Sequence, residues 1–338
     1  MDLNILWFIL IAVLYIGFFF LEGFDFGVGM LLTGLTRKDP ERRAMINTIG
    51  PHWDGNEVWL IVAGGATFAA FPHWYATMFS GFYLGFFLLL FALIVRGVAF
   101  EFRSKVANPT WRYGWDNAIS ISSFVAAFLL GVVFTNLVRG VPIDATKEYA
   151  GSFFTLLNWV SLLGGLTVAI LFQFHGANFL SLKLTEGLRE KAHNHAKMYF
   201  SVSLILVVAL FTVLALTQSA FKDKLFLSLI LPLLSVAAMI VSRVYTSRKR
   251  EGLAFICSSL GVVFFLASFF VVLFPNVMIS TLGAANNLTI YTASSSPYTL
   301  KIMSIIAAIM VPVVLAYQVW TYIVFKKRVK ADPKTLTY

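Results

Sequence analysis

Charged residues and cysteines are scarce in this chain of 338 residues. Only 12% of the residues are charged while 59% are hydrophobic, and the mean hydropathy of +0.82 is far above that of an ordinary soluble domain. A water-soluble fold could not cover that much apolar surface. The single cysteine, Cys257, lies inside an apolar run, which excludes a disulfide framework or a cysteine-based metal site built from this chain alone.

The sequence also lacks the motifs of soluble enzymes. Phosphate-binding glycine loops, nucleophile elbows and zinc-ligand spacings are all missing. The formal net charge of +10 would suit a nucleic-acid partner, but the basic residues are spread over short loops between apolar segments. We therefore expect no nucleic-acid interface.

Apolar runs of about 20 residues, the length of a helix that crosses a bilayer, recur from end to end. The runs are continuous and do not alternate as the strands of a membrane barrel do. The sequence predicts one all-α, polytopic membrane domain over residues 1–338 with about nine spans, and it leaves open an arrangement of two four-helix bundles plus one helix. The spans are expected near residues 5–33, 53–72, 75–96, 117–138, 156–181, 198–217, 225–245, 253–274 and 301–325.

The distribution of basic residues predicts the orientation in the membrane. With these spans, the 26 Lys and Arg residues divide 21 to 5 between the two sides. The positive-inside rule then places the N-terminus outside and the C-terminal segment 326–330 in the cytoplasm. Trp74 and Tyr75 follow Pro72 and are interpreted as interface anchors in the outer turn after the second span.

Four acidic residues fall inside predicted spans, where an ionised side chain costs about 2.5 to 3.5 kcal/mol on insertion scales. Glu22 and Asp25 are three positions apart in the first span and lie on one helix face, and Asp54 and Glu57 repeat that spacing in the second. All four belong to the cytoplasmic half. Two hypotheses explain them: a proton uptake path, which we favour for Asp54, or neutral or arginine-paired acids that lock helices together.

Other ionisable residues have simpler interpretations. Asp116 and Glu101 lie at the cytoplasmic border beside arginines and are predicted to form solvated ion pairs. His193 and His195 are expected to be solvated in a basic loop. His175 is the intramembrane histidine, and a lone histidine is more often a hydrogen-bonded core residue than a haem ligand, so we expect no cofactor or metal on this chain.

Two stretches of the chain carry a family signature. They resemble subunit II of cytochrome bd quinol oxidases, and the similarity extends over essentially the whole chain. The stretches are Glu22-Gly-Phe-Asp-Phe-Gly-Val-Gly-Met30 and Gly50-Pro-His-Trp-Asp-Gly-Asn-Glu-Val-Trp-Leu60.

The resemblance implies a haem-free subunit of a terminal oxidase in a bacterial cytoplasmic membrane. Such a subunit pairs with a subunit I that carries two b-type haems and one d-type haem, and the complex oxidises quinol and reduces dioxygen to water. In the family the acid matching Asp54 is held to lie on a proton path, with the acid matching Asp25 nearby. The family often has Asp in place of Glu22 and Gln in place of Glu57.

Several alternatives stay open. A proton-coupled secondary transporter would also bury carboxyl groups among glycine-interrupted helices, but it should work alone. A subunit with a purely structural role would hold its acids in ion pairs. The sequence does not decide whether a quinone or lipid binds to this chain, which quinol is used, or whether a small accessory subunit joins the complex.

Overall fold

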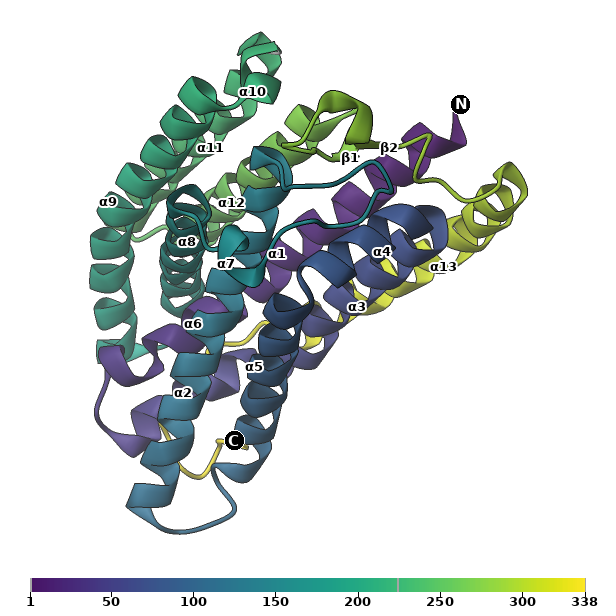
Figure 1. Cartoon of the computed structure of the whole chain (residues 1–338). Coiled ribbons are helices and arrows are strands. Elements are labelled where there is room, and N and C mark those ends of the chain that lie inside the picture. Colours follow the sequence, from purple (N-terminus) through teal and green to yellow (C-terminus); the bar gives the residue numbers. More distant parts are fainter. Residues whose placement is uncertain (1, 224, 338) are drawn as a thin grey trace.

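The computed structural model describes residues 2–223 and 225–337, and the chain folds into an all-α bundle (Figure 1). Eight of the described helices are long and apolar enough to cross a membrane. Together with one more long helix, Trp53–Ala70, they form two four-helix groups and one further helix. The first bundle contains α1 (Leu3–Leu35), α3 (Trp53–Ala70), α5 (Tyr83–Phe102) and α6 (Pro109–Arg139). The second contains α8 (Trp159–Lys183), α9 (Glu186–Thr217), α11 (Leu225–Ser247) and α12 (Glu251–Leu273), and the further helix is α13 (Pro297–Val324).

Helix α3 is the ninth expected span. Its 18 residues rise about 27 Å, close to the thickness of the hydrocarbon core. Asp54, Asn56 and Glu57 in its first turns lower its hydropathy, and it is not among the eight helices that are apolar enough to cross a membrane. The polar residues that are candidates for function are therefore the same residues that lower the hydropathy of this helix.

Short elements connect the long helices. They are α2 (Asp39–Ile49), α4 (Pro72–Gly81), α7 (Phe153–Leu156), α10 (Ser219–Asp223), a 3-10 turn η1 (Ala284–Asn286), and the antiparallel strands β1 (Asn276–Met278) and β2 (Leu288–Thr289).

Local sequence determines where several helices begin. The side chains of Asn108, Asn158 and Ser296 accept hydrogen bonds from backbone N–H groups in the first turns of α6, α8 and α13. Pro109 and Pro297 occupy the first helical position, where a missing N–H costs nothing.

The two bundles meet where α1 crosses α8. A Cβ atom added to Gly27 would lie 2.0 Å from the carbonyl oxygen of Phe172 and 2.9 Å from the backbone of Gly176, so only glycine fits. Gly23, one turn earlier, packs against the ring of Phe172. This stripe of small residues brings the backbones close together, which is typical of a membrane helix that packs against another helix.

The ends of the bundle differ in charge. The end at which α1 stops and α6 begins carries most of the arginines and lysines, and we call it the basic end. The C-terminal segment closes part of it: the backbone N–H of Val329 donates to the carbonyl of Lys183 (2.7 Å), and Arg328 donates to the carbonyl of Leu184 (2.8 Å). The N-terminus lies at the opposite end of the molecule (Figure 1).

Helix α13 lies beside α1 and α3 at one edge of the first bundle (Figure 1). None of its most apolar 18-residue window is buried inside the chain. Helices α8 and α12 of the second bundle are better covered, since 72% and 61% of their corresponding windows are buried. The apolar side chains of α13 are therefore almost all exposed to the surroundings of the chain.

Two expectations about single residues are wrong. Trp74 is not an interface anchor in a turn but is fully buried in α4, because Pro72 begins a helix there. His193 is not solvated in a loop. Helix α9 begins at Glu186, and His193 is buried with its Nε2 atom 3.1 Å from a carboxylate oxygen of Glu251.

Candidate functional site

Two carboxyl groups lie inside the first bundle on α1. Glu22 and Asp25 are both 0% exposed, one helical turn apart. They occupy the part of α1 that is buried on every side, because its small residues let α8 approach closely. Because the two acids lie on one face, as predicted, Glu22 meets Arg96 and Asp25 meets Asn56 in the same region of the first bundle.

The cation that meets these acids is Arg96 of α5, which is also 0% exposed. Its Nη1 atom forms ion pairs with Glu22 and with Glu57 of α3, the latter at 3.1 Å. The guanidinium carbon lies 4.7 Å from the ring centre of Phe26 and 5.2 Å from that of Phe100, which adds cation–π attraction. Arg96 thus joins α1, α3 and α5 through charge.

Asn56 of α3 connects Asp25 to helix α13. Its side-chain N–H donates to Asp25 Oδ2 (2.7 Å). Its carbonyl oxygen accepts hydrogen bonds from Gln318 Nε2 (2.8 Å) and from the hydroxyl of Tyr322 (3.0 Å). Both of the latter side chains come from α13, so a helix with little packing in this chain still reaches the buried acids. We call Glu22, Asp25, Asn56, Glu57 and Arg96 the Arg96 cluster.

Asp54 is separate from this cluster. It is exposed on the surface of α3, and no hydrogen bond or ion pair is found for its side chain within residues 2–223 and 225–337. The structure therefore brings Glu22, Asp25 and Glu57 together around Arg96 and leaves Asp54 facing outward on the same helix as Asn56.

His52 lies at the basic-end side of the Arg96 cluster, immediately before α3. Its ring stacks on that of Tyr322 with centroids 4.3 Å apart, and Phe325 packs against its edge. Burial, and to a smaller extent the charge of Lys183, lower the pKa of His52 to about 4. The side chain is therefore neutral at pH 7.

His175, the histidine singled out as intramembrane, uses both ring nitrogens. Nδ1 lies 2.9 Å from the hydroxyl of Ser258, and Nε2 lies 3.1 Å from the carbonyl oxygen of Phe20. Its ring stacks on Phe255. These contacts do not fit an axial haem ligand, and the described part of the chain contains no group of three or more His, Cys, Asp or Glu side chains that could hold a metal ion.

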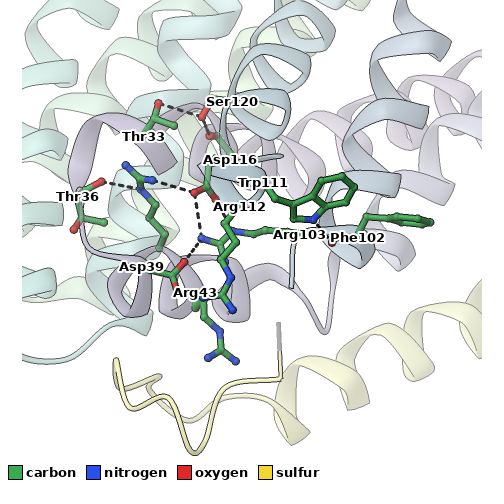
Figure 2. A network of polar contacts seen from close by, with 12 residues as sticks. Thr33, Thr36, Asp39, Arg43, Phe102, Arg103, Trp111, Arg112, Asp116 and Ser120 are labelled. Atoms are coloured by element: carbon green, nitrogen blue, oxygen red, sulfur yellow. Dashed lines mark hydrogen bonds and ion pairs between the residues drawn. The ribbon is translucent and has the colours of Figure 1, made fainter. Parts of the chain in front are cut away.

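A second cluster of charges lies at the basic end, and we call it the Asp116 cluster (Figure 2). Arg103 donates to Asp116 through Nε (2.5 Å) and Nη2 (3.1 Å) and to Asp39 through Nη2 (2.8 Å). Arg42 donates to Asp116 (3.0 Å), and Arg112 donates to Asp39 (3.0 Å). Asp116 and Arg103 were expected to be a solvated pair, but they are buried, because α2 folds back over them. Burial alone would lower the pKa of Arg103, but the hydrogen bonds and charges of Asp116 and Asp39 raise it above the ordinary value.

A large apolar cavity adjoins the Arg96 cluster. It has a volume of about 710 Å³ and lies between α3, α4, α5 and α6. Glu57 is the charged residue of its lining, with Tyr15 as a further polar group, and the other lining residues are mostly aromatic or aliphatic. Glu57 therefore faces both Arg96 and this cavity.

Some of these residues were missed by sequence reasoning. Arg96 was assigned to the end of a span, where basic residues usually lie. The signal that could have indicated its burial is that the apolar run continues past it to Phe100. Asn56, Gln318 and Tyr322 are uncharged, and their hydropathy alone does not distinguish them from other polar residues in spans.

The fold and these contacts define a polytopic helical membrane protein in which buried carboxyl groups meet at a single guanidinium. Comparison with known proteins gives the family. The family model described as "Cytochrome bd terminal oxidase subunit II" matches residues 3–325. The chain therefore belongs to this family, and it is a subunit of an oxidoreductase complex that also contains a partner subunit I.

Individual relatives agree with this assignment. Cytochrome bd ubiquinol oxidase subunit 2 of Bacillus subtilis is 44% identical over 337 residues, which cover 100% of this chain and 99% of the relative. Cytochrome bd-I ubiquinol oxidase subunit 2 of Escherichia coli K12 is 35% identical, with 95% and 93% covered. The bd oxidase structure from Geobacillus thermodenitrificans has a chain with the same fold, with a TM-score of 0.79 at 16% identity and with 96% of this chain and 98% of that chain covered.

Proposed function

We propose that this chain is the haem-free subunit II of a quinol-oxidising, dioxygen-reducing oxidase, and that it supports the haem-bearing subunit I and conducts cytoplasmic protons toward it. The basic end is cytoplasmic in this proposal, in a bacterial cytoplasmic membrane, following the positive-inside rule. The two b-type haems and the d-type haem belong to the partner. The engaged ring nitrogens of His175 support this division.

The observation that carries the proton role is the ratio of charges in the Arg96 cluster. Arg96 pairs with Glu22 and Glu57, and the third carboxyl group, Asp25, is held by Asn56, so a fully ionised cluster would hold two uncompensated negative charges inside the bundle. Burying unpaired charges is far more expensive than sharing protons. Such a cluster changes its charge by taking up and releasing protons, which is what a conduit needs.

The exposed position of Asp54 supports an exit toward the partner. A carboxylate that faced lipid would cost about 2.5 to 3.5 kcal/mol, so the face of α3 that carries Asp54 belongs against protein. Helix α13 flanks that face and is itself almost uncovered. We infer that subunit I docks on α3 and α13 and brings its own groups to Asp54.

The energetic output follows from the sides of the membrane that supply and receive protons. Quinol oxidation releases protons outside, and the protons used to form water enter from the cytoplasm. Each charge moved in this way works against a potential worth about 2.3 kcal/mol per 100 mV. No pumping residue on this chain is required.

The apolar cavity beside Glu57 suits a bound quinone or lipid tail. Its volume of about 710 Å³ falls in the range of small-molecule sites, and its lining is apolar with few polar groups. We propose a structural role for that ligand, because redox centres are assigned to the partner. Ubiquinol and menaquinol would fit the cavity equally well, and a small accessory subunit is compatible with the uncovered surfaces.

The experiment that tests the assignment is purification of the tagged chain from its native membrane, followed by a reduced-minus-oxidised spectrum. We expect b- and d-type haem bands that disappear when the gene for subunit I is deleted, while the chain itself is still found in the membrane. A colourless, monodisperse protein with no partner would contradict the proposal. Substrate flux by that protein in vesicles would then support a secondary transporter.

A further inference from the structure

The Asp116 cluster contains more positive than negative charge. Arg103 and Arg42 are buried with Asp116, and Arg112 pairs with Asp39. Arg37 lies beside them, and its side chain has no ion pair among the described residues. Four arginines and two aspartates leave two positive charges uncompensated. The neighbouring acid Glu41 does not offset them, because it pairs with Lys191 (2.8 Å).

Donor atoms in this cluster are unused. The Nε atom of Arg112 and the Nη1 atom of Arg103 are buried and have no hydrogen-bond partner within the part of the chain that the structure describes. Arg103 is only 1% exposed as a residue. Buried donors without an acceptor are rare and expensive, so an acceptor is expected to complete the cluster. The carboxylates are already engaged by arginines and cannot supply it.

A pocket opens among these groups. Its volume is about 290 Å³, and its lining contains Arg37, Arg42, Arg112 and Tyr113 together with the two aspartates. Arg42 is held in place by its hydrogen bonds and by the ring of Tyr113, whose centre lies 5.4 Å from the guanidinium carbon. Arg42 is therefore fixed beside the space before any ligand enters, which lowers the entropy cost of binding.

We place the pocket at the level of the membrane interface. It adjoins the end of α1 and the first turn of α6, and Trp111 and Tyr113 in that turn are 38% and 52% exposed. Exposed aromatic residues at the end of a membrane helix mark the headgroup layer. Arginine forks match phosphate oxygens in geometry and in charge. A bound cation is disfavoured because both aspartates are neutralised by arginine.

We propose that this pocket binds the phosphate of an anionic group at the membrane border, with Arg37 and Arg112 as the accessible ligands and Arg42 and Arg103 as the buried support. The headgroup of an anionic phospholipid and free inorganic phosphate present the same chemistry. The lipid is favoured because the exposed Trp111 and Tyr113 beside the pocket place it at the headgroup layer.

Arg37 and Arg112 are suitable positions for a test because neither is part of the buried core. Arg37 has no ion pair in the described chain, and Arg112 is partly exposed. The purified complex with its partner subunit is stripped of lipid in detergent. It is then titrated with dioleoyl phosphatidylglycerol or dioleoyl phosphatidylcholine and examined by native mass spectrometry. The matched control is Arg248→Gln, which removes an exposed arginine at the same end of the bundle but outside the pocket.

We expect wild type and Arg248→Gln to retain one phosphatidylglycerol more tightly than phosphatidylcholine. Loss of one charge-assisted hydrogen bond corresponds to about a tenfold weaker affinity, so Arg37→Gln and Arg112→Gln should each reduce that preference by about this factor. Arg112→Lys should lose less than Arg112→Gln, because the charge remains. If millimolar inorganic phosphate displaces the phosphatidylglycerol, the site is confirmed but free phosphate is its ligand. Equal retention of phosphatidylglycerol by wild type, Arg37→Gln and Arg112→Gln would overturn the proposal.

Discussion

The first bundle contains two clusters of charged side chains that differ in which charge is in surplus. The Arg96 cluster holds three carboxyl groups and one guanidinium, which pairs with two of them, and in the Asp116 cluster two carboxylates meet three arginines with a fourth beside them. A surplus of carboxyl groups can be relieved by protons, which are always available. A surplus of guanidinium groups cannot lose its charge and must be relieved by an anion. The same residue types therefore suit one cluster to proton transfer and the other to anion binding.

The largest expected effect is on thermal stability, and it appears when one carboxylate is removed from the Asp116 cluster. The same kind of change in the Arg96 cluster serves as the comparison. Asp116→Asn should lower the thermal midpoint of the purified complex by on the order of 10 °C, because it leaves Arg42 and Arg103 buried without their shared anion, a loss of about 3–5 kcal/mol. Glu22→Gln should cost far less, because a neutral group there lessens the surplus around Arg96.

Glu101→Gln is the control for this pair of variants, since Glu101 is exposed near the Asp116 cluster and its substitution should change stability by no more than about 0.5 kcal/mol. Equal destabilisation by Asp116→Asn and Glu22→Gln would show that the stability lost does not depend on whether the excess charge of the cluster is positive or negative.

The next effect is on turnover. Asp54→Asn should reduce quinol oxidase turnover by about a hundredfold while the haem spectrum and thermal midpoint stay unchanged, because Asp54 is exposed on α3 and its side chain has no hydrogen bond or ion pair within the described chain. Turnover and midpoint are measured on the same preparation. The corresponding change at the basic end, Asp39→Asn, should leave turnover unchanged. A fully active Asp54→Asn complex would favour a purely structural subunit.

A smaller effect concerns pH. The pKa of His52 falls from 6.5 to about 4 in the folded chain, so the unfolded chain binds a proton first as the pH drops. Stability contributed by neutral His52 is therefore complete above about pH 6.5 and decreases progressively toward pH 4. His52→Gln should reduce the pH dependence of the thermal midpoint of the complex over that range. His73→Gln, at an exposed position on α4, should not. A slope that persists in His52→Gln would assign it to other groups.

Sequence reasoning predicted more of the fold than of the site, and the reason is physical. A span is an average over about 20 residues, so the positions of most helices followed from hydropathy. A site depends on which way single side chains point. Asp54 and Glu57 are three positions apart, yet one faces outward and the other reaches a buried arginine.

Arg96 is the clearest example of a site residue that local sequence could not predict. Basic residues near the end of an apolar run are ordinarily solvated, and only tertiary packing brings carboxyl groups from α1 and α3 to this one. Asp116 was misjudged for the same reason, because α2 covers it from outside its own helix. Burial by a distant segment cannot be read from local sequence.

The smallest expected effect is at Glu57, and it separates two roles of the Arg96 cluster. Glu57 lies between Arg96 and the apolar cavity, and its ion pair of 3.1 Å is partly exposed. Glu57→Gln keeps the size and a hydrogen-bond acceptor, and Arg96 retains Glu22. We therefore expect turnover to change by less than about twofold and the free energy of unfolding by less than about 1 kcal/mol. If turnover instead fell as far as in Asp54→Asn, the proton route would pass through Glu57. The third carboxyl group would then be part of the conduit and not only a neighbour of it.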